Sequence, residues 1–379
     1  MIRSRTLPTL PALLLAAAFL AMIAFGATRW LLAPDATALP ALNVAADTAA
    51  AAPGALNPST LYKQRAQTVV AIDSTINGEE LHGAGVVVKA DGTIVTASHV
   101  IRDYRAGAQA SQVWVRFHSH DQVQARVVAI DQWNDLAVLK VDASQVTGLV
   151  AAPLGTAETS LVGAEVAAIG HPFGHDWTQT TGHITSLHQT VDSQINSQWR
   201  VPDAIEFDAA INQGNSGGPL FDARGRVIGI VQQIAGTSKT SSGVAFAIPS
   251  SIISRTLALS ASHELIPYAW TGIDSVDLTP QLAREYKLGV DAGALVQHAY
   301  GPAAAAGIRT GSTVLEAGKQ LSVGDVVIGL AGQPVTSADD LGRIAGLLTP
   351  DAPVDVVVMR GGHRQSLRLT PTTQKVTPA

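Results

Sequence analysis

One short segment of the 379-residue chain combines a serine with the glycines that a nucleophile needs. Ser216 stands within Gly214-Asn215-Ser216-Gly217-Gly218-Pro219. A serine hydroxyl attacks a carbonyl only when a base removes its proton and hydrogen-bond donors stabilise the oxyanion that forms. Glycines permit a turn in which the backbone N–H groups of Gly214 and Ser216 converge on one point. The segment predicts a nucleophilic serine with an oxyanion hole; the alternative is a glycine-rich turn with an incidental serine.

A base for this serine is expected among the 11 histidines. His99 follows the apolar run 93–97, and the end of a strand is a rigid support for an exposed side chain. A structural histidine is the alternative. A third group must hold the imidazole in one tautomer. Asp135, just before the apolar run 136–139, and Asp131 are the candidates, and Asp131 is also explained as a residue that caps a turn.

Composition limits the other kinds of chemistry. The chain has no cysteine, which excludes disulfides and cysteine-ligated metal sites. Its net charge of −5 gives no basic field of the kind that binds nucleic acid. His118 and His120 would share one face of a strand, but no third metal ligand accompanies them. Four other histidines lie in predicted loops: His171, His175, His183 and His188. No phosphate-binding loop is present, so we expect neither a metal nor a cofactor.

The N-terminus carries the one long apolar run of the chain. Residues 7–28 contain no charge and lie between Arg5 and Arg29, which is long enough for a membrane-spanning helix. Ala24-Phe25-Gly26 is a passable signal-peptidase site, so a cleaved signal peptide is the alternative. We expect residues 1–30 to be a signal anchor or signal peptide, with the rest of the chain outside the cytoplasm.

Composition and hydrophobic pattern divide the rest of the chain into a large β-rich domain and a smaller α+β domain. The large domain has many short Val and Ile runs separated by glycine or Asp-Gly, which is typical of strands and hairpins. The smaller domain combines short strands with two helical stretches, 302–308 and 337–348. The expected segments are an Ala/Pro-rich linker at 31–57, the β-rich domain at 58–250, a hinge at 251–265, the α+β domain at 266–371 and a tail at 372–379.

The chain order histidine, aspartate, serine is that of chymotrypsin-type proteases, and residues 60–250 resemble the protease domain of the HtrA (Deg) family of trypsin-fold serine endoproteases. The resemblance is carried by Thr96 to Val100, Asp135 to Leu139, Ala168 to Gly174, Asp208 to Leu220 and Gly243 to Pro249. It implies a mostly β fold with two six-stranded barrels and the triad His99, Asp135 and Ser216 in the cleft between them. It therefore favours Asp135 over Asp131.

The resemblance also implies a substrate preference. In the trypsin fold the residue six before the nucleophile lies at the base of the specificity pocket, and here it is Ala210. Without a carboxylate there, a buried substrate Lys or Arg would be unpaired. The strand similar to the pocket wall contributes Gln232, Gln233 and Ile234, and the bulk of Ile234 would narrow the entrance. Cleavage after small or aliphatic residues is expected.

The smaller domain resembles a PDZ domain of the permuted bacterial type. Trp270-Thr271-Gly272-Ile273 matches the family's loop that binds a peptide C-terminus through backbone N–H groups. Two departures from the family stand out. Residues 309–323 are inserted before Gly324-Asp325, where they would reshape the peptide groove, and His171 replaces an asparagine often found before Pro-Phe-Gly.

The resemblance as a whole implies an ATP-independent periplasmic serine endoprotease of protein quality control or envelope-stress signalling. Its substrates would be misfolded or signalling proteins, and C-terminal peptides bound to the PDZ domain would regulate it. One PDZ domain and an apolar N-terminus resemble the DegS branch, which is anchored to the inner membrane, and the family implies a homotrimer. The alternatives are a chaperone-like holdase or adaptor with little proteolysis, and a secreted digestive-type protease, which the PDZ domain and the absence of cysteine disfavour.

Overall fold

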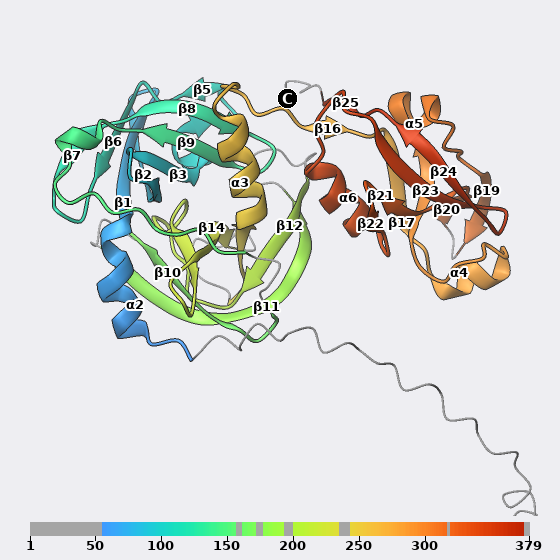
Figure 1. The fold of residues 1–379 in the computed structure, drawn as a ribbon, viewed down its shortest axis with the longest axis horizontal. Coiled ribbons are helices and arrows are strands. Elements are labelled where there is room, and N and C mark those ends of the chain that lie inside the picture. The colour runs from blue at the N-terminus through green and yellow to red at the C-terminus, as the bar shows by residue number, and fades with distance from the viewer. Residues whose placement is uncertain are drawn as a thin grey trace, which may run out of the picture. The chain divides into compact units, whose positions relative to one another are not determined.

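The computed structural model describes residues 55–156, 161–171, 177–192, 200–234, 243–316 and 319–374. All of them belong to one compact unit, Gly54–Ala379, and Figure 1 shows their strands and helices. The expected N-terminal anchor at 1–30 and nearly all of the linker at 31–57 lie outside the described residues. No helix in the described part of the chain has the length and apolar character to cross a membrane.

The first half of the β-rich domain follows a short helix, α2 (Pro58–Arg65), and a 3-10 turn, η1 (Ala66–Thr68). Its seven-stranded sheet has the order β7-β6-β1-β2-β3-β9-β8. The strands are β1 (Val69–Ile76), β2 (Glu79–Lys89), β3 (Thr93–Ala97), β6 (Gln112–Arg116), β7 (Gln122–Gln124), β8 (Arg126–Asp131) and β9 (Leu136–Lys140). A 3-10 turn, η2 (Ser98–Val100), follows β3, and the pair β4 (Arg102–Asp103) and β5 (Ala108–Gln109) forms a small separate sheet.

The second half of this domain is a closed six-stranded barrel, β10-β11-β12-β15-β14-β13. Its strands are β10 (Glu165–Gly170), β11 (Thr178–Asp192), β12 (Arg200–Phe207), β13 (Pro219–Asp222), β14 (Val227–Ile234) and β15 (Ala245–Pro249). It has the strand number that the resemblance implied. The first half differs from that expectation, since the short strand β7 is added beyond β6 and does not pair with β8 in the described residues.

Apolar side chains join the two halves. Val86 and Val95 of the first sheet pack in one buried cluster with Ile169, Phe221 and Ile230 of the barrel. Burial of this kind contributes about 25 cal/mol for each Å² of apolar surface removed from water. The cluster therefore fixes the positions of the ends of β3 and β10 relative to the turn that precedes β13.

A helix, α3 (Ser250–Leu259), begins one residue before the segment expected as a hinge and covers its first part. Ile252 and Ile253 are buried in the cluster that joins the halves, and Thr256 Oγ1 donates to Asp131 Oδ2 at 2.8 Å. The first ten residues after β15 are thus packed against the β-rich domain.

The C-terminal α+β domain is built around the sheet β17-β18-β21-β23-β24, with β22 beside β21. Its strands and helices are β16 (Ala269–Trp270), β17 (Ile273–Asp277), α4 (Pro280–Glu285), β18 (Ala294–Ala299), α5 (Gly301–Ala305), β19 (Ser312–Glu316), β20 (Lys319–Val323), β21 (Val326–Leu330), β22 (Gln333–Pro334), α6 (Ala338–Gly346), β23 (Val354–Arg360), β24 (His363–Leu369) and β25 (Thr372–Thr373). The stretch predicted as helical at 302–308 overlaps α5, and the stretch at 337–348 contains α6.

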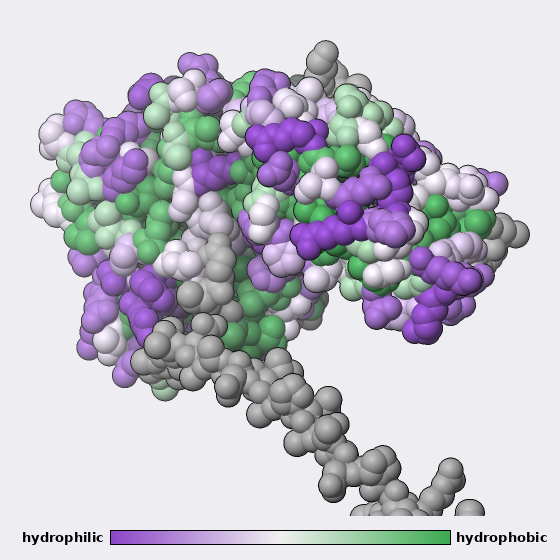
Figure 2. Space-filling model, turned by 45° about the vertical axis from the view of Figure 1, so that its right-hand side comes forward, coloured by the Kyte–Doolittle hydropathy of each residue, from purple (hydrophilic) through white to green (hydrophobic). Residues whose placement is uncertain are grey.

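The face drawn in Figure 2 carries hydrophilic and hydrophobic residues in interspersed patches.

Candidate active site

A histidine and an aspartate from two different turns meet at the edge of the first sheet. His99 lies in η2 directly after β3, and Asp135 lies in the turn between β8 and β9. Because β3 pairs with β9, Ala97 lies opposite Leu136, which brings the two turns together. His99 Nδ1 and Asp135 Oδ2 are 2.6 Å apart. This contact has the geometry of the aspartate–imidazole pair of a Ser-His-Asp triad.

The backbone of Asp135 aims its carboxylate at this turn. Its φ of 51° lies in the left-handed region, which non-glycine residues adopt at a cost of about 1–2 kcal/mol. Its other carboxylate oxygen, Oδ1, accepts from the His99 backbone N–H at 2.9 Å and from Ser98 Oγ at 2.7 Å. Three hydrogen bonds therefore fix the carboxylate, and His99 Nδ1 must carry its proton so that Nε2 is the basic nitrogen.

The environment of His99 sets its charge balance. Burial disfavours the imidazolium, whereas the charge of Asp135 and its hydrogen bond favour it, and the pKa of His99 is raised from 6.5 as the net result. The side chain is 31% exposed. His99 can therefore hold the proton of a nucleophile during reaction while its ring remains reachable from solvent.

Two residues that the sequence reasoning missed support this pair. Tyr104 Oη lies 2.7 Å from Ser98 Oγ. Since the Ser98 hydroxyl donates to Asp135, the Tyr104 hydroxyl must be the donor to Ser98. Burial, followed by the charge of Asp135, raises the pKa of Tyr104, so its proton stays in place. The sequence signal was weak, since a serine before a histidine and a tyrosine five residues after it are common.

The rival aspartate has another role. Asp131 is 1% exposed and accepts from Asn134 Nδ2 at 2.9 Å and from Thr256 Oγ1 at 2.8 Å. Burial raises the pKa of Asp131 although these hydrogen bonds lower it. Asp131 therefore ties its turn to α3, and in the described structure the carboxylate bound to His99 is that of Asp135.

The turn that carries Ser216 presses against the β2–β3 hairpin. Ala84 N donates to the Ser216 carbonyl oxygen at 2.8 Å. Gly217 has a φ of 83°, and an added Cβ would overlap Thr96 Oγ1 and the Ala84 carbonyl oxygen. Only glycine fits there without displacing β3. The close approach puts Ser216 beside β3, the strand that leads into the turn of His99.

The Ser216 hydroxyl is turned toward the barrel. Ser216 Oγ donates to the Gln232 carbonyl oxygen at 2.9 Å, and no hydrogen bond joins it to His99 among the described residues. The two expected oxyanion donors belong to this same turn: Gly214 is buried with a φ of 100° and Ser216 is half-buried. Their N–H groups have no acceptor within the described parts of the chain, so both remain able to bind an oxyanion.

The expected specificity residues are only partly described. Ala210 is exposed and precedes the serine turn. Gln232 is 4% exposed and contacts Ser216 through its carbonyl oxygen. Gln233 and Ile234 belong to β14, but their side chains lie outside the described residues.

The histidines considered as metal ligands make other contacts. The rings of His118 and His120 lie 5.0 Å and 6.2 Å from the ring of Trp177. His183 and His188 lie beside Asp208 and Asp203. No cluster of His, Asp or Glu suited to a metal ion occurs in the described part of the chain, and His175 lies outside it.

Comparison with known proteins decides the family. Residues 83–230 match the model of the trypsin-like peptidase domain. A solved structure titled HtrA-type protease AlgW with tripeptide aligns with a TM-score of 0.68 and 30% identity, over 85% of this chain and 98% of that chain. A second solved structure, titled HtrA-type protease AlgWS227A with tripeptide, aligns with a TM-score of 0.65 and 30% identity, over 86% of this chain and 99% of that chain. This chain belongs to the HtrA-type proteases. Its β-rich domain is therefore a trypsin-like protease domain.

Curated relatives of this HtrA-type protease are longer. A probable periplasmic serine endoprotease, DegP-like, from Pseudomonas putida (strain W619) is 34% identical over 295 residues, which are 76% of this chain and 55% of the relative. Protease Do-like 1, chloroplastic, from Arabidopsis thaliana is 37% identical over 290 residues, 76% of this chain and 63% of the relative. The chain thus spans between about half and two thirds of the length of these two relatives.

The C-terminal domain of this HtrA-type protease has a tight loop at the residues expected to bind peptide. Trp270 ends β16, and Ile273 begins β17, which is an edge strand. Gly272 has a φ of 74°, and an added Cβ would overlap the Tyr300 carbonyl oxygen. Thr271 is buried, and Trp270 is 37% exposed. An exposed edge strand beside such a loop can add a peptide strand through backbone hydrogen bonds.

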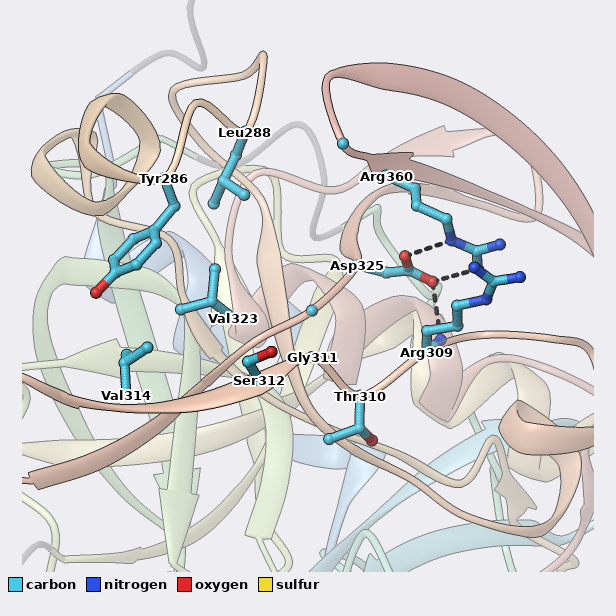
Figure 3. Close-up of a pocket in the computed structure, with 12 residues that line it drawn as sticks. Tyr286, Leu288, Arg309, Thr310, Gly311, Ser312, Val314, Val323, Asp325 and Arg360 are labelled. Atoms are coloured by element: carbon cyan, nitrogen blue, oxygen red, sulfur yellow. Dashed lines mark hydrogen bonds and ion pairs between the residues drawn. The ribbon is translucent and has the colours of Figure 1, made fainter.

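The inserted segment forms the hairpin β19–β20 and borders a pocket of about 430 Å³ (Figure 3). One wall is apolar, from Tyr286, Leu288, Val314 and Val323. Opposite them, Arg360 donates to Asp325 through Nε at 2.8 Å and Nη2 at 2.6 Å. The lining includes no residue of the 270–273 loop or of α6. The insertion therefore shapes a hollow separate from the expected peptide loop.

Proposed function

We propose that the chain is a cofactor-free serine endopeptidase that uses His99, Asp135 and Ser216. The 2.6 Å contact between His99 Nδ1 and Asp135 Oδ2, beside the serine turn, is the observation that carries the proposal. It leaves Nε2 as a base, and membership of the HtrA-type proteases supports the same activity.

In the acylation step, Ser216 Oγ attacks the scissile carbonyl carbon as His99 Nε2 takes the hydroxyl proton. The backbone N–H groups of Gly214 and Ser216 stabilise the negative charge on the carbonyl oxygen. His99 then gives its proton to the leaving amine, and the C–N bond breaks. Water repeats the sequence on the acyl-serine ester and releases the acid with regeneration of the hydroxyl.

The Ser216 hydroxyl must leave the Gln232 carbonyl oxygen before it can react. Rotation about χ1 exchanges that 2.9 Å hydrogen bond for one to His99. A neutral hydrogen bond contributes about 0.5–1.5 kcal/mol net, so the exchange is small against the barrier of the reaction. The present arrangement is a resting state that substrate binding converts into the active one.

Substrate selection is proposed to follow from Ala210. An alanine at the pocket base offers no charge to a substrate Lys or Arg, because a buried cation without a counterion is strongly disfavoured. Cleavage therefore follows small or aliphatic residues such as Val or Ala. Cleavage-site mass spectrometry on a denatured protein that instead showed mainly Lys and Arg before the cut would reject this assignment.

The C-terminal domain is proposed to be a PDZ domain that binds peptide C-termini at Trp270, Thr271, Gly272 and Ile273. The edge strand β17 and the Gly272 turn support this role. The AlgW structures are titled as complexes with a tripeptide and a decapeptide, which supports peptide recognition in this chain too. Binding of a peptide to this domain would then control whether the Ser216 hydroxyl leaves its resting hydrogen bond to Gln232.

The cellular setting is proposed from the relatives and the sequence. The bacterial relatives are named as periplasmic serine endoproteases, which supports a periplasmic location. The uncharged segment 7–28 supports attachment to the inner membrane through an N-terminal helix. The substrates are misfolded or signalling proteins, in quality control or in a DegS-like stress response, and the assembly is a homotrimer.

Active-site labelling tests the activity. A fluorophosphonate probe reacts only with an activated serine hydroxyl. We expect labelling of the full chain, increased by peptides with free C-termini, and none in Ser216→Ala. Ser144→Ala is a matched control, because Ser144 lies in the turn after β9 and its hydroxyl donates to Asp142 Oδ1 at 2.6 Å, with no contact to the residues of the proposed triad. Labelling that persists in Ser216→Ala would refute the assignment of the nucleophile.

A holdase or adaptor is the second candidate, and one observation favours it. The Ser216 hydroxyl is bound to a backbone carbonyl rather than to His99. If that state persists with peptide bound, the chain would hold unfolded proteins without cutting them. Absence of labelling at every peptide concentration, together with suppressed aggregation of a denatured protein, would select this function.

A further inference from the structure

A small hairpin at the surface of the protease domain reaches the proposed triad through one side chain. β4 and β5 pair Asp103 with Ala108, and the Asp103 carboxylate closes the turn between them by accepting from Arg105 N at 2.9 Å. Residues 105–107 at its tip are exposed. The side chain of Tyr104 instead reaches the buried Ser98, with Oη 2.7 Å from Oγ. The hairpin therefore places one phenol hydroxyl against the turn that carries His99.

The hydrogen bonds that start at this hydroxyl run in one direction. Ser98 has a single hydroxyl proton and gives it to Asp135 Oδ1 at 2.7 Å, because an ionised carboxylate only accepts. Tyr104 must then supply the proton between the two hydroxyl groups. A hydroxyl that accepts a hydrogen bond is polarised into a stronger donor. The order from Tyr104 to Ser98 to Asp135 therefore strengthens the bond that ends on the carboxylate.

Charged groups around the phenol keep it a donor. The guanidinium carbon of Arg102 lies 5.3 Å from the centre of the Tyr104 ring, a cation–π contact that holds the ring. Burial raises the pKa of Tyr104, and the charges of Asp135 and Asp131 raise it further, whereas Arg102 and the hydrogen bond with Ser98 lower it. The net effect is a raised pKa, so the hydroxyl keeps its proton wherever the enzyme works.

We propose that Tyr104 and Ser98 are positioning residues for the triad aspartate: the Tyr104 hydroxyl acts through Ser98 to hold Oδ1 of Asp135, so that Oδ2 stays on His99 Nδ1. Two donors share Oδ1, the Ser98 hydroxyl and the His99 backbone N–H. Loss of the first leaves the carboxylate less firmly oriented, which slows the reaction. It also leaves the negative charge less compensated, which favours the imidazolium and raises the pKa of His99 further. The inference rests on the proposed peptidase activity.

The test is a double-mutant cycle on the second-order rate of fluorophosphonate labelling of the full chain. Tyr104→Phe removes only the hydroxyl, and we expect the rate at neutral pH to fall about two- to tenfold, as for one neutral hydrogen bond. Ser98→Ala should lower the rate about ten- to hundredfold, because its hydrogen bond ends on a charge. Since Tyr104 acts through Ser98, Tyr104→Phe should change the rate by less than about twofold in the Ser98→Ala background.

The pH dependence of labelling separates positioning from folding. The acid side of the profile reports the protonation of His99, and it should move to higher pH in Tyr104→Phe and in Ser98→Ala. A merely structural role would lower the rate equally at every pH. If Ser98→Ala does not fold, the movement in Tyr104→Phe carries the test. Tyr62→Phe is the matched control, because Tyr62 is half-buried in α2 and packs against the apolar cluster that joins the two halves. Its rate and profile should stay those of the wild type.

The outcomes are distinct. If the two substitutions reduce the rate independently, or if the acid side stays in place in folded Tyr104→Phe, the coupling of Tyr104 to Asp135 is overturned and the peptidase stands. An equal movement in Tyr62→Phe overturns the assignment to the hairpin. A wild type that is not labelled at any pH refutes the peptidase itself.

Discussion

Replacing Asp135 by asparagine should reverse the tautomer of His99, and the contacts around Asp135 show why. Oδ1 accepts from the His99 backbone N–H, at 2.9 Å, and an amide N–H can only donate. The carbonyl oxygen of the new Asn side chain must therefore take the place of Oδ1. Its NH₂ group then takes the place of Oδ2 and faces His99 Nδ1. Nδ1 is forced to accept, the ring proton moves to Nε2, and the base for Ser216 is lost.

The size of the effect follows from that loss. In a Ser-His-Asp triad this tautomer change reduces kcat by about 10⁴-fold, equivalent to about 5 kcal/mol in the barrier. A second effect concerns pH. The charge and hydrogen bond of Asp135 raise the pKa of His99, and burial lowers it. Without the carboxylate only the effect of burial remains, so the pKa of His99 falls below its usual value. The acid side of the pH–rate profile then moves to lower pH.

The assay is peptide cleavage as a function of pH, with active-site labelling to count the competent serines. Asp131→Asn is the matched control, because Asp131 is equally buried but bonds to Asn134 and Thr256. We expect its kcat to stay within about tenfold of the wild type. Folded Asp135→Asn with kcat within about tenfold of the wild type at neutral pH would refute the tautomer argument.

Three further predictions concern stability. Gly217→Ala should lower the denaturant concentration at which the protease domain unfolds, because the added Cβ has no space. The matched variant Gly163→Ala has open space around its Cβ and a φ of 86°, so it should lower the free energy of unfolding by only about 1–2 kcal/mol. Asp325→Ala leaves Arg360 without its buried carboxylate and costs about 3–5 kcal/mol, against about 0–1 kcal/mol for the exposed Asp355→Ala. Because folding raises the pKa of His99, its pairing stabilises the fold below pH 6.5. The difference in Tm between wild type and His99→Gln should therefore shrink as pH rises from about 5.5 to about 9.

Much of the architecture was accessible from local signals. Asp-Gly between apolar runs predicts the β2–β3 hairpin, and the structure turns there with Gly92 at a φ of 86°. The predicted helical stretch 302–308 overlaps α5, and the stretch 337–348 contains α6. The closure of the first sheet was not predicted correctly, because the sheet has seven strands and its outer strands, β7 and β8, are not paired in the described residues. The membrane segment stays a prediction.

The sequence by itself determined which residue types could react: a serine between glycines, a histidine at a strand end and an aspartate before an apolar run. Only the tertiary structure shows which of two aspartates contacts His99. The left-handed backbone at Asp135 directs its carboxylate to His99, whereas the carboxylate of Asp131 accepts a hydrogen bond from Thr256 of α3. The tertiary structure also brought Tyr104 and Gln232 to the site and Arg116 beside His171. The contacts of Asp131 with Thr256 and of Arg116 with His171 join residues 125 and 55 positions apart, and only tertiary packing brings such distant residues together.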